Sequence, residues 1–212
     1  MGERGRASAT KVTGVVLAGG ASRRMGQEKA QLVIQGEPLL ARVTRLLRLT
    51  FSAVIVVGPP SLAELVPGVT VVPDTRAEQG PLAGLEAAFA ATRPTLLFVV
   101  ACDMPFLSPT LARRMVEIAL AQPDADAVAL RSPLGLEPLH AVYRRACHPV
   151  TTAVLDGGER SLQALLARVR VMEVTPKERA RGDPAGLATV NVNTPEEWRR
   201  ALLLAEDWRP PA

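Results

Sequence analysis

The segment that most constrains the fold lies near the start of the chain, where an apolar run is cut off by two glycines and followed by basic residues. Val12–Ala18 is the apolar run, Gly19 and Gly20 end it, and the next residues include Arg24 and Lys29. Glycines allow a tight turn and bring backbone N–H groups close to an anion, while cationic side chains balance the remaining charge. The segment therefore predicts a strand that leads into a phosphate-binding loop.

This loop differs from two better-known phosphate loops. A Walker loop has contiguous Gly-Lys-Ser/Thr, but here two residues separate Gly26 from Lys29, and Ala30 follows. The dinucleotide fingerprint G-x-G-x-x-G does not fit either, because Gly19 and Gly20 are adjacent and the next glycine is Gly26. The alternative interpretation is a tight turn between a strand and a helix with a solvated basic face.

Strand and helix patterns alternate through the first part of the chain. Short β-branched runs, typical of buried parallel strands, are separated by longer segments of helical period that open near a proline. The expected strands are Val12–Ala18, Ala53–Val57, Val69–Val72, Thr95–Ala101 and Ala127–Leu130, and the expected helices are Pro38–Leu49, Pro81–Ala91 and Pro109–Ala121. This alternation predicts an α/β protein with a mostly parallel sheet.

The pattern changes after Leu130. The expected elements are a turn at Arg131–Gly135, a strand within Glu137–Arg144, a strand at Arg170–Val174, a loop at Pro176–Gly186 and a strand at Leu187–Val192 that rejoins the sheet. The closing helix has a clear start signal, with Thr194 as N-cap, Pro195 at the first helical position and Glu197 completing a capping box.

Size and composition suit one domain. The 212 residues are 48% hydrophobic, which is ample for a core covered on two faces, and no repeat or linker divides the chain. Residues 1–10 are polar and are expected to form a flexible tail. No apolar run reaches the roughly 20 residues that span a bilayer, and the two cysteines, Cys102 and Cys147, predict reduced thiols. We therefore expect a soluble cytoplasmic protein.

Charge and composition also limit the chemistry. The net charge is +4, but the charge is dispersed and only 3% of residues are aromatic, so nucleic acid is not an expected partner. The only histidines are His140 and His148, which do not form a zinc motif or a Ser/His/Asp arrangement. His140 and Tyr143 are not counted as ligands. A small anionic substrate explains the basic loop better than a polyanion does.

The ends of the expected strands carry the candidate ligands, because open α/β sheets bind ligands outside the carboxyl ends of their strands. Asp103 follows the strand at Thr95–Ala101 and is the candidate magnesium ligand. Mg²⁺ takes only one or two carboxylates and completes its octahedron with phosphate oxygens and water. The alternative is that Asp103 caps the following turn.

Three more polar residues lie at such positions. Asp74 could accept hydrogen bonds from a base or sugar, or could be a solvated turn residue. Asn191 and Asn193 are two apart in an expected strand, so their amides would share a face with Val192 buried behind them. The paired amides could fix a ribose, a phosphate or a metal-bound water, or could stabilise a turn at the end of the strand.

These motifs together resemble the molybdenum cofactor guanylyltransferases of the MobA type. The resemblance covers about Val12 to Trp198 and rests on Leu17-Ala-Gly-Gly-x-Ser-x-Arg24-Met-Gly26-x-x-Lys29, Gly80-Pro-Leu-Ala-Gly84, Asp103-x-Pro105, Glu137-Pro-Leu139 and Asn191-Val-Asn193-Thr-Pro195. The first motif alone indicates the wider nucleotidyltransferase family. The Gly-Pro-Leu-Ala-Gly and Asn-Val-Asn-Thr-Pro motifs narrow it to the guanylyl branch.

The resemblance implies a Rossmann-like three-layer α/β/α domain that binds Mg²⁺ and GTP. It further implies transfer of GMP to the terminal phosphate of molybdopterin, which yields the guanine dinucleotide form of the cofactor and pyrophosphate. Proteins that deliver the cofactor or mature molybdoenzymes are the implied protein partners, with no role for nucleic acid or a membrane.

The resemblance also implies roles for individual residues. Leu17, Ala18 and Gly19 would approach the nucleotide through their backbone, Arg24 and Lys29 would hold phosphates, Asp74 would contact the nucleoside, Asp103 would bind magnesium, and Asn191 and Asn193 would lie on the pterin side of the cleft. Two positions depart from the family pattern. Glu28 replaces the usual Asp before the lysine, and Val57-Gly58 stands where relatives can carry an Asn that helps to hold guanine.

The implied reaction agrees with the residues present. A phosphate nucleophile is already anionic near neutral pH, so no general base is required. Positioning and charge stabilisation by Mg²⁺, Lys29, Arg24 and backbone N–H groups would supply the catalysis. Two alternatives stay open: a cytidylyl or sugar-phosphate nucleotidyltransferase of the same fold, and a non-catalytic nucleotide-binding regulatory module.

Overall fold

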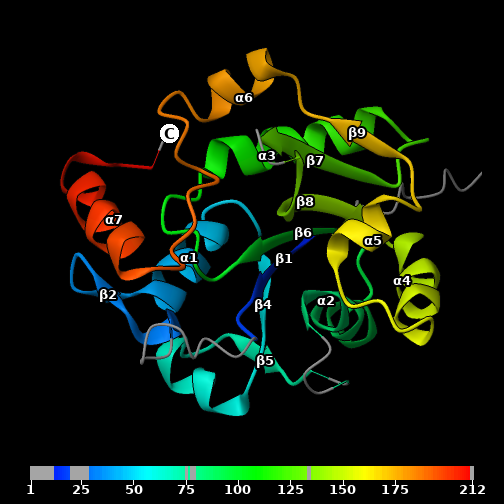
Figure 1. The fold of residues 1–212 in the computed structure, drawn as a ribbon, viewed down its shortest axis with the longest axis horizontal. Helices are drawn as coiled ribbons and strands as arrows, with labels where there is room; N and C mark the ends of the chain where they lie inside the picture. The colour runs from blue at the N-terminus through cyan, green and yellow to red at the C-terminus, as the bar shows by residue number, and fades with distance from the viewer. Residues whose placement is uncertain (1–11, 20–28, 75, 77–79, 133–134, 211–212) are drawn as a thin grey trace, which may run out of the picture.

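The computed structural model describes residues 12–19, 29–74, 76, 80–132 and 135–210 (Figure 1). The expected tail at residues 1–10 lies outside these ranges. The strands are β1 (Val12–Leu17), β2 (Val33–Ile34), β3 (Glu37–Pro38), β4 (Ala53–Val57), β5 (Thr70–Val72), β6 (Leu96–Ala101), β7 (Ala127–Ser132), β8 (Gly135–Arg144) and β9 (Val171–Glu173). The helices are α1 (Leu39–Arg48), α2 (Gly80–Ala91), α3 (Pro109–Ala121), α4 (Cys147–Asp156), α5 (Leu162–Leu166), α6 (Pro176–Gly182) and α7 (Pro195–Asp207), with 3₁₀ turns η2 (Lys29–Gln31) and η3 (Pro60–Leu65).

Seven strands form one sheet in the order β5-β4-β1-β6-β8-β7-β9, and β2 and β3 form a small separate hairpin. The strand β1 pairs in parallel with β4 and β6, β4 with β5, and β7 with β9, whereas β8 runs antiparallel to both of its neighbours. The chain moves outward from β1 through β4 to β5 and then returns to β6 on the other side of β1. Ligands of open α/β sheets bind at such a reversal of strand order.

Helices cover both faces of the sheet, and this confirms the expected three-layer α/β/α architecture (Figure 1). Successive side chains of a strand point to opposite faces. On β1, Val16 belongs to the core shared with α1 and α3, while Val15 belongs to the core shared with α2, α4 and α5. Both valines are fully buried. The continuous apolar strands therefore reflect burial on two sides rather than one.

Most helices and strands begin and end close to the residues that the local sequence signals predict. The bounds expected for β4 and α3 are confirmed, β1, β5 and β6 differ from expectation by one residue at one end, and α1 is shorter by one residue at each end. Ser108 caps α3, since its hydroxyl accepts a hydrogen bond from the Leu111 N–H. The capping box of Thr194 and Glu197 at the start of α7 is present as predicted.

Two expectations for the last third of the chain are wrong. The segment expected to be a loop contains α6, which begins with a capping box formed by Thr175 and Glu178. The segment at Leu187–Val192 does not form a strand. Instead, the buried carboxylate of Asp183 accepts the Leu187 and Ala188 N–H groups at 3.1 and 2.9 Å. These bonds satisfy backbone donors that a strand would have given to a sheet neighbour.

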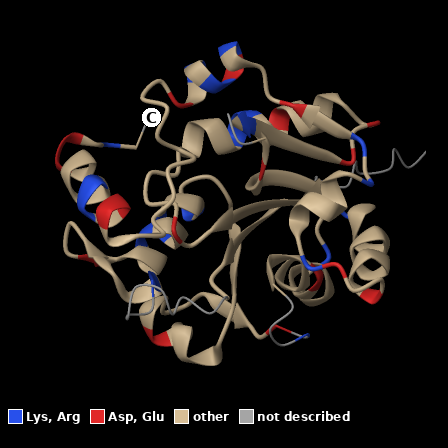
Figure 2. Ribbon diagram, in the orientation of Figure 1, with Lys and Arg blue, Asp and Glu red and all other residues tan. Residues whose placement is uncertain are grey.

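The distribution of charge, the character of the helices and the state of the cysteines each relate to an expectation from the sequence. Figure 2 shows basic and acidic positions interspersed along α6 and α7 and across other elements, so the positive charge is dispersed as expected. Within the described ranges, none of the helices combines the length and apolar character that a bilayer crossing demands. Cys102 and Cys147 are both free thiols.

Candidate active site

The candidate site begins where β1, β4 and β6 end together. The Ala18 N–H donates to the Val57 carbonyl at 2.8 Å, and the Cys102 N–H donates to the Leu17 carbonyl at 3.0 Å. The three strands thus stay paired until their last residues. Gly19, the next residue, is exposed. The expected glycine loop therefore leaves the sheet at the point where the strand order reverses.

Three predicted site residues lie in contact at this edge. The Lys29 Nζ atom donates to Asp103 Oδ2 at 2.9 Å and to Asn193 Oδ1 at 2.6 Å. The side chains of Lys29 and Asp103 are 15% and 17% exposed, so the ion pair is largely removed from solvent while one side stays open. The arrangement presents an ammonium group and a carboxylate to the same small volume, which is the combination that a metal-bound phosphate requires.

Local structure fixes each member of the cluster that Lys29, Asp103 and Asn193 form. Lys29 opens the 3₁₀ turn η2, and Asp103 follows β6 after one residue. The Val192 N–H donates to the Asp103 carbonyl at 3.0 Å, which ties the segment before α7 to the end of β6. Asn193 then lies immediately before Thr194, the N-cap of α7. Three distant parts of the chain are therefore held together by backbone as well as side-chain bonds.

Asn191 adds an unsatisfied acceptor to this edge. Its Oδ1 atom is buried and has no hydrogen-bond partner in the described part of the chain. Val192 is fully buried and Asn193 is exposed, whereas the Asn191 oxygen is buried, so the two amides differ in exposure and the strand expected to place them on one face is absent. A buried acceptor without a partner costs free energy. The Asn191 oxygen is therefore a position where a bound donor or cation would be favoured.

Cys102 lies between the strand and Asp103 but does not add a nucleophile. Burial raises the pKa of the Cys102 thiol to about 12, the negative charge of Asp103 adds to this effect, and Lys29 opposes it. The thiolate is the reactive form of cysteine. Near neutral pH the thiol therefore stays protonated, and the charged groups of the cluster are Lys29 and Asp103.

Asp74 lies on the same edge but on the other side of β1. It follows β5, which is three strand spacings from β6, or about 14 Å across the sheet. Its Oδ1 atom accepts the Arg76 N–H at 3.3 Å. Burial raises the pKa of the Asp74 carboxyl, the Arg76 N–H opposes this, and the charge of Glu86 adds to it. Asp74 and Asp103 thus follow strands that lie on opposite sides of β1.

Several predicted positions have a packing role or lie outside the described ranges. Arg24 and the glycine loop after Gly19 are outside, so their predicted phosphate contacts stay predictions. At Gly84, a Cβ atom would lie 3.3 Å from Leu17 Cδ2, so this glycine lets α2 pack closely on β1. At Gly58, a Cβ atom would lie 3.3 Å from the Ala18 carbonyl oxygen. A side chain at Gly58 would therefore crowd the backbone at the end of β1.

The donor set at this edge fits magnesium. The described residues contain no group of three or more His, Cys, Asp or Glu side chains that could hold a metal ion. Mg²⁺ does not need such a group, because it keeps waters and phosphate oxygens and takes one or two carboxylates. Asp103 supplies one such carboxylate after the end of β6. Asp103 is thus the residue that would hold the ion.

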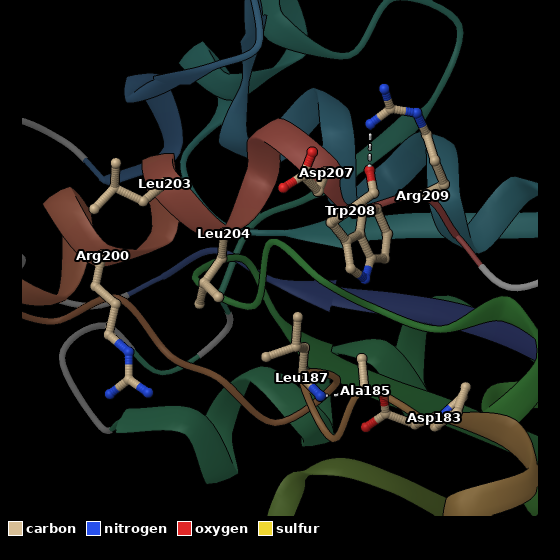
Figure 3. A pocket seen from close by; sticks show the side chains of 10 residues that line it. Asp183, Ala185, Leu187, Arg200, Leu203, Leu204, Asp207, Trp208 and Arg209 are labelled. Carbon is tan, nitrogen blue, oxygen red and sulfur yellow. Dashed lines mark hydrogen bonds between the residues drawn. The ribbon is translucent and has the colours of Figure 1, made fainter.

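A separate apolar pocket of about 700 Å³ lies elsewhere, between α7 and the segment 183–187 (Figure 3). Leu187, Leu204 and Trp208 contribute its apolar lining, and Arg200 and Asp207 contribute charged groups. It adjoins the C-terminal end of α7, whereas Asn193 precedes the N-terminal end. The pocket therefore does not belong to the cluster at the strand ends, and nothing in the sequence indicated it.

Comparisons with known proteins agree with the geometry. The sequence model described as the MobA-like NTP transferase domain matches residues 14–173. A protein of Pelotomaculum thermopropionicum named "Probable molybdenum cofactor guanylyltransferase" is 40% identical over 200 residues, which cover 94% of this chain and 96% of the relative. A "Molybdenum cofactor guanylyltransferase" of Desulfosudis oleivorans is 30% identical, with 90% and 94% of the two chains covered.

A solved structure supports the fold in the same way. The molybdopterin-guanine dinucleotide biosynthesis protein A of Archaeoglobus fulgidus superposes with a TM-score of 0.80 at 24% identity, covering 92% of this chain and all of that one. The superposition shows the fold, and the matches in sequence show the family. Together they confirm the resemblance that the motifs indicated: the chain belongs to the MobA-like NTP transferase family.

Proposed function

We propose that this protein is a molybdenum cofactor guanylyltransferase, which transfers GMP from GTP to the terminal phosphate of molybdopterin and releases pyrophosphate. The observation that carries the proposal is the contact of Lys29 with both Asp103 and Asn193 at the carboxyl ends of β1 and β6. A chain of the MobA-like NTP transferase family thus retains an ammonium, a carboxylate and an amide at the reversal of its strand order.

In the proposed reaction, an oxygen of the molybdopterin phosphate attacks the α-phosphorus of GTP. A new P–O bond forms, the bond from the α-phosphorus to the bridging oxygen of the β-phosphate breaks, and the electron pair leaves with pyrophosphate. The attacking phosphate is largely ionised at neutral pH and needs no base to remove a proton. The protein therefore has to align two anionic groups and offset their charge.

Lys29 is the residue that we assign to charge stabilisation. Its ammonium group is held by Asp103 and Asn193, so it needs little reorganisation when a phosphate arrives. Asp103 would hold Mg²⁺ together with oxygens of the triphosphate, and the ion would supply further neutralisation at the α-phosphate. Arg24 is proposed as a second phosphate ligand from the glycine loop.

The two substrates are assigned to opposite sides of β1. We place the nucleoside toward β5, where Asp74 could accept hydrogen bonds from it, and the pterin toward Asn191 and Asn193. Gly58 has no side chain, so guanine contacts in this chain would come from groups other than a side chain at that position. Backbone groups of Leu17, Ala18 and Gly19 are candidates, although the Ala18 N–H already donates to Val57 and the Leu17 carbonyl already accepts the Cys102 N–H.

The compartment and partners follow from the same proposal. The free thiols Cys102 and Cys147 suit the reducing cytoplasm, which we propose as the site of action. Proteins that deliver molybdopterin, or that accept the finished dinucleotide during molybdoenzyme maturation, are the proposed partners.

The test is pyrophosphate release from GTP, CTP, ATP and UTP, each with Mg²⁺ and with or without molybdopterin. The proposal expects release that requires the acceptor and is at least about tenfold faster with GTP than with CTP, which corresponds to 1.4 kcal/mol in the barrier. A preference for CTP would move the protein to the cytidylyl branch. Tight nucleotide binding without release from any nucleotide would instead favour the non-catalytic module.

A further inference from the structure

Arg76 joins the segment that carries Asp74 to two helices on the same face of the sheet. Its Nε and Nη2 atoms donate to the two carboxylate oxygens of Glu86 in α2, at 2.8 and 3.0 Å. Its Nη1 atom donates to Asp156 in α4 at 2.8 Å. All three bonds come from one guanidinium group, which is planar and holds its partners in a fixed orientation.

The pair with Glu86 is the inner part of this connection. The Glu86 side chain is 11% exposed, whereas that of Asp156 is 62% exposed. Glu86 Oε1 also accepts the Thr152 hydroxyl of α4 at 2.9 Å, so both of its oxygens have partners. Exposed ion pairs contribute little, and pairs with ideal two-pronged geometry that are shielded from water contribute more. Glu86 is therefore the partner that fixes Arg76.

Arg76 also holds Asp74, through a hydrogen bond from the Arg76 backbone. The Arg76 N–H donates to Asp74 Oδ1 at 3.3 Å, so the guanidinium anchors the backbone that orients the Asp74 carboxylate. Among the described residues, Arg76 acts on the pKa of Asp74 through its backbone N–H, which lowers it, and the charge of Glu86 on α2 raises it, while burial of the carboxyl is the largest cause of the rise. Arg76 thus acts on Asp74 in two ways, as an anchor of the backbone and as the counter-charge to Glu86.

We propose that Arg76 is a positioning residue for nucleotide binding, which through Glu86 holds Asp74 where it meets the nucleoside of the substrate. This inference rests on the proposed function, because it takes Asp74 to be the nucleoside contact. It adds a residue to which none of the motifs pointed. Its consequence is that Arg76 affects only ligands that contain a nucleoside.

The test compares GTP with inorganic triphosphate, which has the phosphates but not the nucleoside. Dissociation constants are measured by calorimetry with Mg²⁺ and without acceptor, for wild type, Arg76→Met and Arg114→Met. Arg114 is the matched control, since it also pairs with two carboxylates, Glu117 on its own helix α3 and Glu178 on α6. We expect Arg76→Met to weaken GTP binding about tenfold, to leave triphosphate binding unchanged, and Arg114→Met to change neither.

A double variant separates the two ways in which Arg76 could act. In Arg76→Met/Glu86→Gln the unbalanced charge of Glu86 is gone, but the anchor is still missing. The proposal expects the double variant to bind GTP as weakly as Arg76→Met does. Recovery of wild-type affinity would overturn it, because Arg76 would then serve only to offset Glu86. Arg76→Lys, which keeps the charge without the fork, is expected to recover less than half of the lost binding free energy.

Steady-state kinetics complete the test. We expect Arg76→Met to raise the KM for GTP with little change in kcat, since the triphosphate and acceptor contacts stay in place. Equal loss for GTP and triphosphate, or a lower melting temperature with unchanged GTP affinity, would overturn the inference. If wild type binds GTP more tightly than triphosphate but transfers no GMP, the proposed function fails while the Arg76 comparison still stands. Wild type that binds both ligands equally would overturn the inference alone.

Discussion

The Lys29 ammonium nitrogen lies 2.9 Å from the Oδ2 atom of Asp103, although 74 positions separate the two residues in the chain. The contact forms because β1 and β6 are neighbours in the sheet and end together. Lys29 returns to this edge after the glycine loop, and Asp103 follows β6. A cation and a carboxylate placed side by side can bind a metal–phosphate unit whose own charges are of both signs.

Replacement of Asp103 by Asn should stop catalysis while leaving the fold intact. Asn keeps the size of the side chain but removes the negative charge that would hold Mg²⁺, so we expect GMP transfer to fall at least about 100-fold. The measurement is pyrophosphate release at saturating GTP and acceptor. Asp124→Asn, at an exposed position after α3, is the control and should keep wild-type activity. Near-normal turnover by the Asp103 variant would refute its assignment.

Replacement of Lys29 by Met should lower kcat rather than raise KM alone. Met preserves the length of the stem, but the charge that stabilises the transferring phosphate is lost, and we expect about a 100-fold fall in kcat. Single-turnover measurements with saturating GTP isolate the chemical step. Lys177→Met, at an exposed position on α6, controls for the loss of one lysine. A Lys29 variant with normal kcat and only a raised KM would show that Lys29 binds but does not stabilise the transition state.

Local structure and the positions where strands end could be predicted from the sequence, because both depend on short-range signals. Apolar β-branched runs, proline starts and the Thr194 capping box predicted most of the sheet and the helices α1, α2, α3 and α7, but not α4 or α5. The rule that ligands lie at the carboxyl ends of strands then selected Asp103 and Asp74 without a structure. That Lys29 contacts both Asp103 and Asn193 could not be predicted from these local signals, because it depends on how three distant segments meet.

The errors also have physical causes. The helix α6 was missed because the segment is polar and contains Gly and Pro residues, although Thr175, Pro176 and Glu178 supply a complete start signal. The strand expected at Leu187–Val192 fails because the Asp183 carboxylate takes the first two backbone donors. A side chain that competes with the sheet for backbone bonds is not visible in a hydrophobic pattern.

Gly182→Ala should destabilise the protein through a backbone clash. A Cβ atom at Gly182 would lie 2.7 Å from Leu111 Cα, and backbone of α3 cannot move aside as a flexible side chain can. We expect a loss of about 1–3 kcal/mol in the free energy of unfolding, measured by urea denaturation. Gly157→Ala is the matched control, because its Cβ would meet other atoms only at 3.4 Å or more. Equal effects of the two substitutions would contradict the close packing of α6 on α3.

His140 should make the stability of the protein depend on pH. The ring is fully buried on β8, and neither nitrogen has a hydrogen-bond partner in the described ranges. Its edge packs against Phe98. Burial lowers the pKa of His140 to about 4, the Arg179 charge adds to this, and the nearby Ala188 backbone opposes it. The ring therefore stays neutral in the folded protein at pH values where it is protonated in the unfolded chain.

Between about pH 4 and the ordinary histidine pKa of about 6.5, the unfolded chain binds more protons at this ring than the folded protein does. The free energy of unfolding should therefore be highest above pH 6.5 and should fall by up to about 3 kcal/mol as the pH drops to 4. His140→Leu keeps the volume, removes two unpaired polar atoms and should be nearly neutral at pH 7. Urea denaturation at pH 5, 6 and 7 should then show a smaller loss of stability on acidification for the variant than for wild type. Equal slopes in the two proteins would mean that His140 is not the group that titrates.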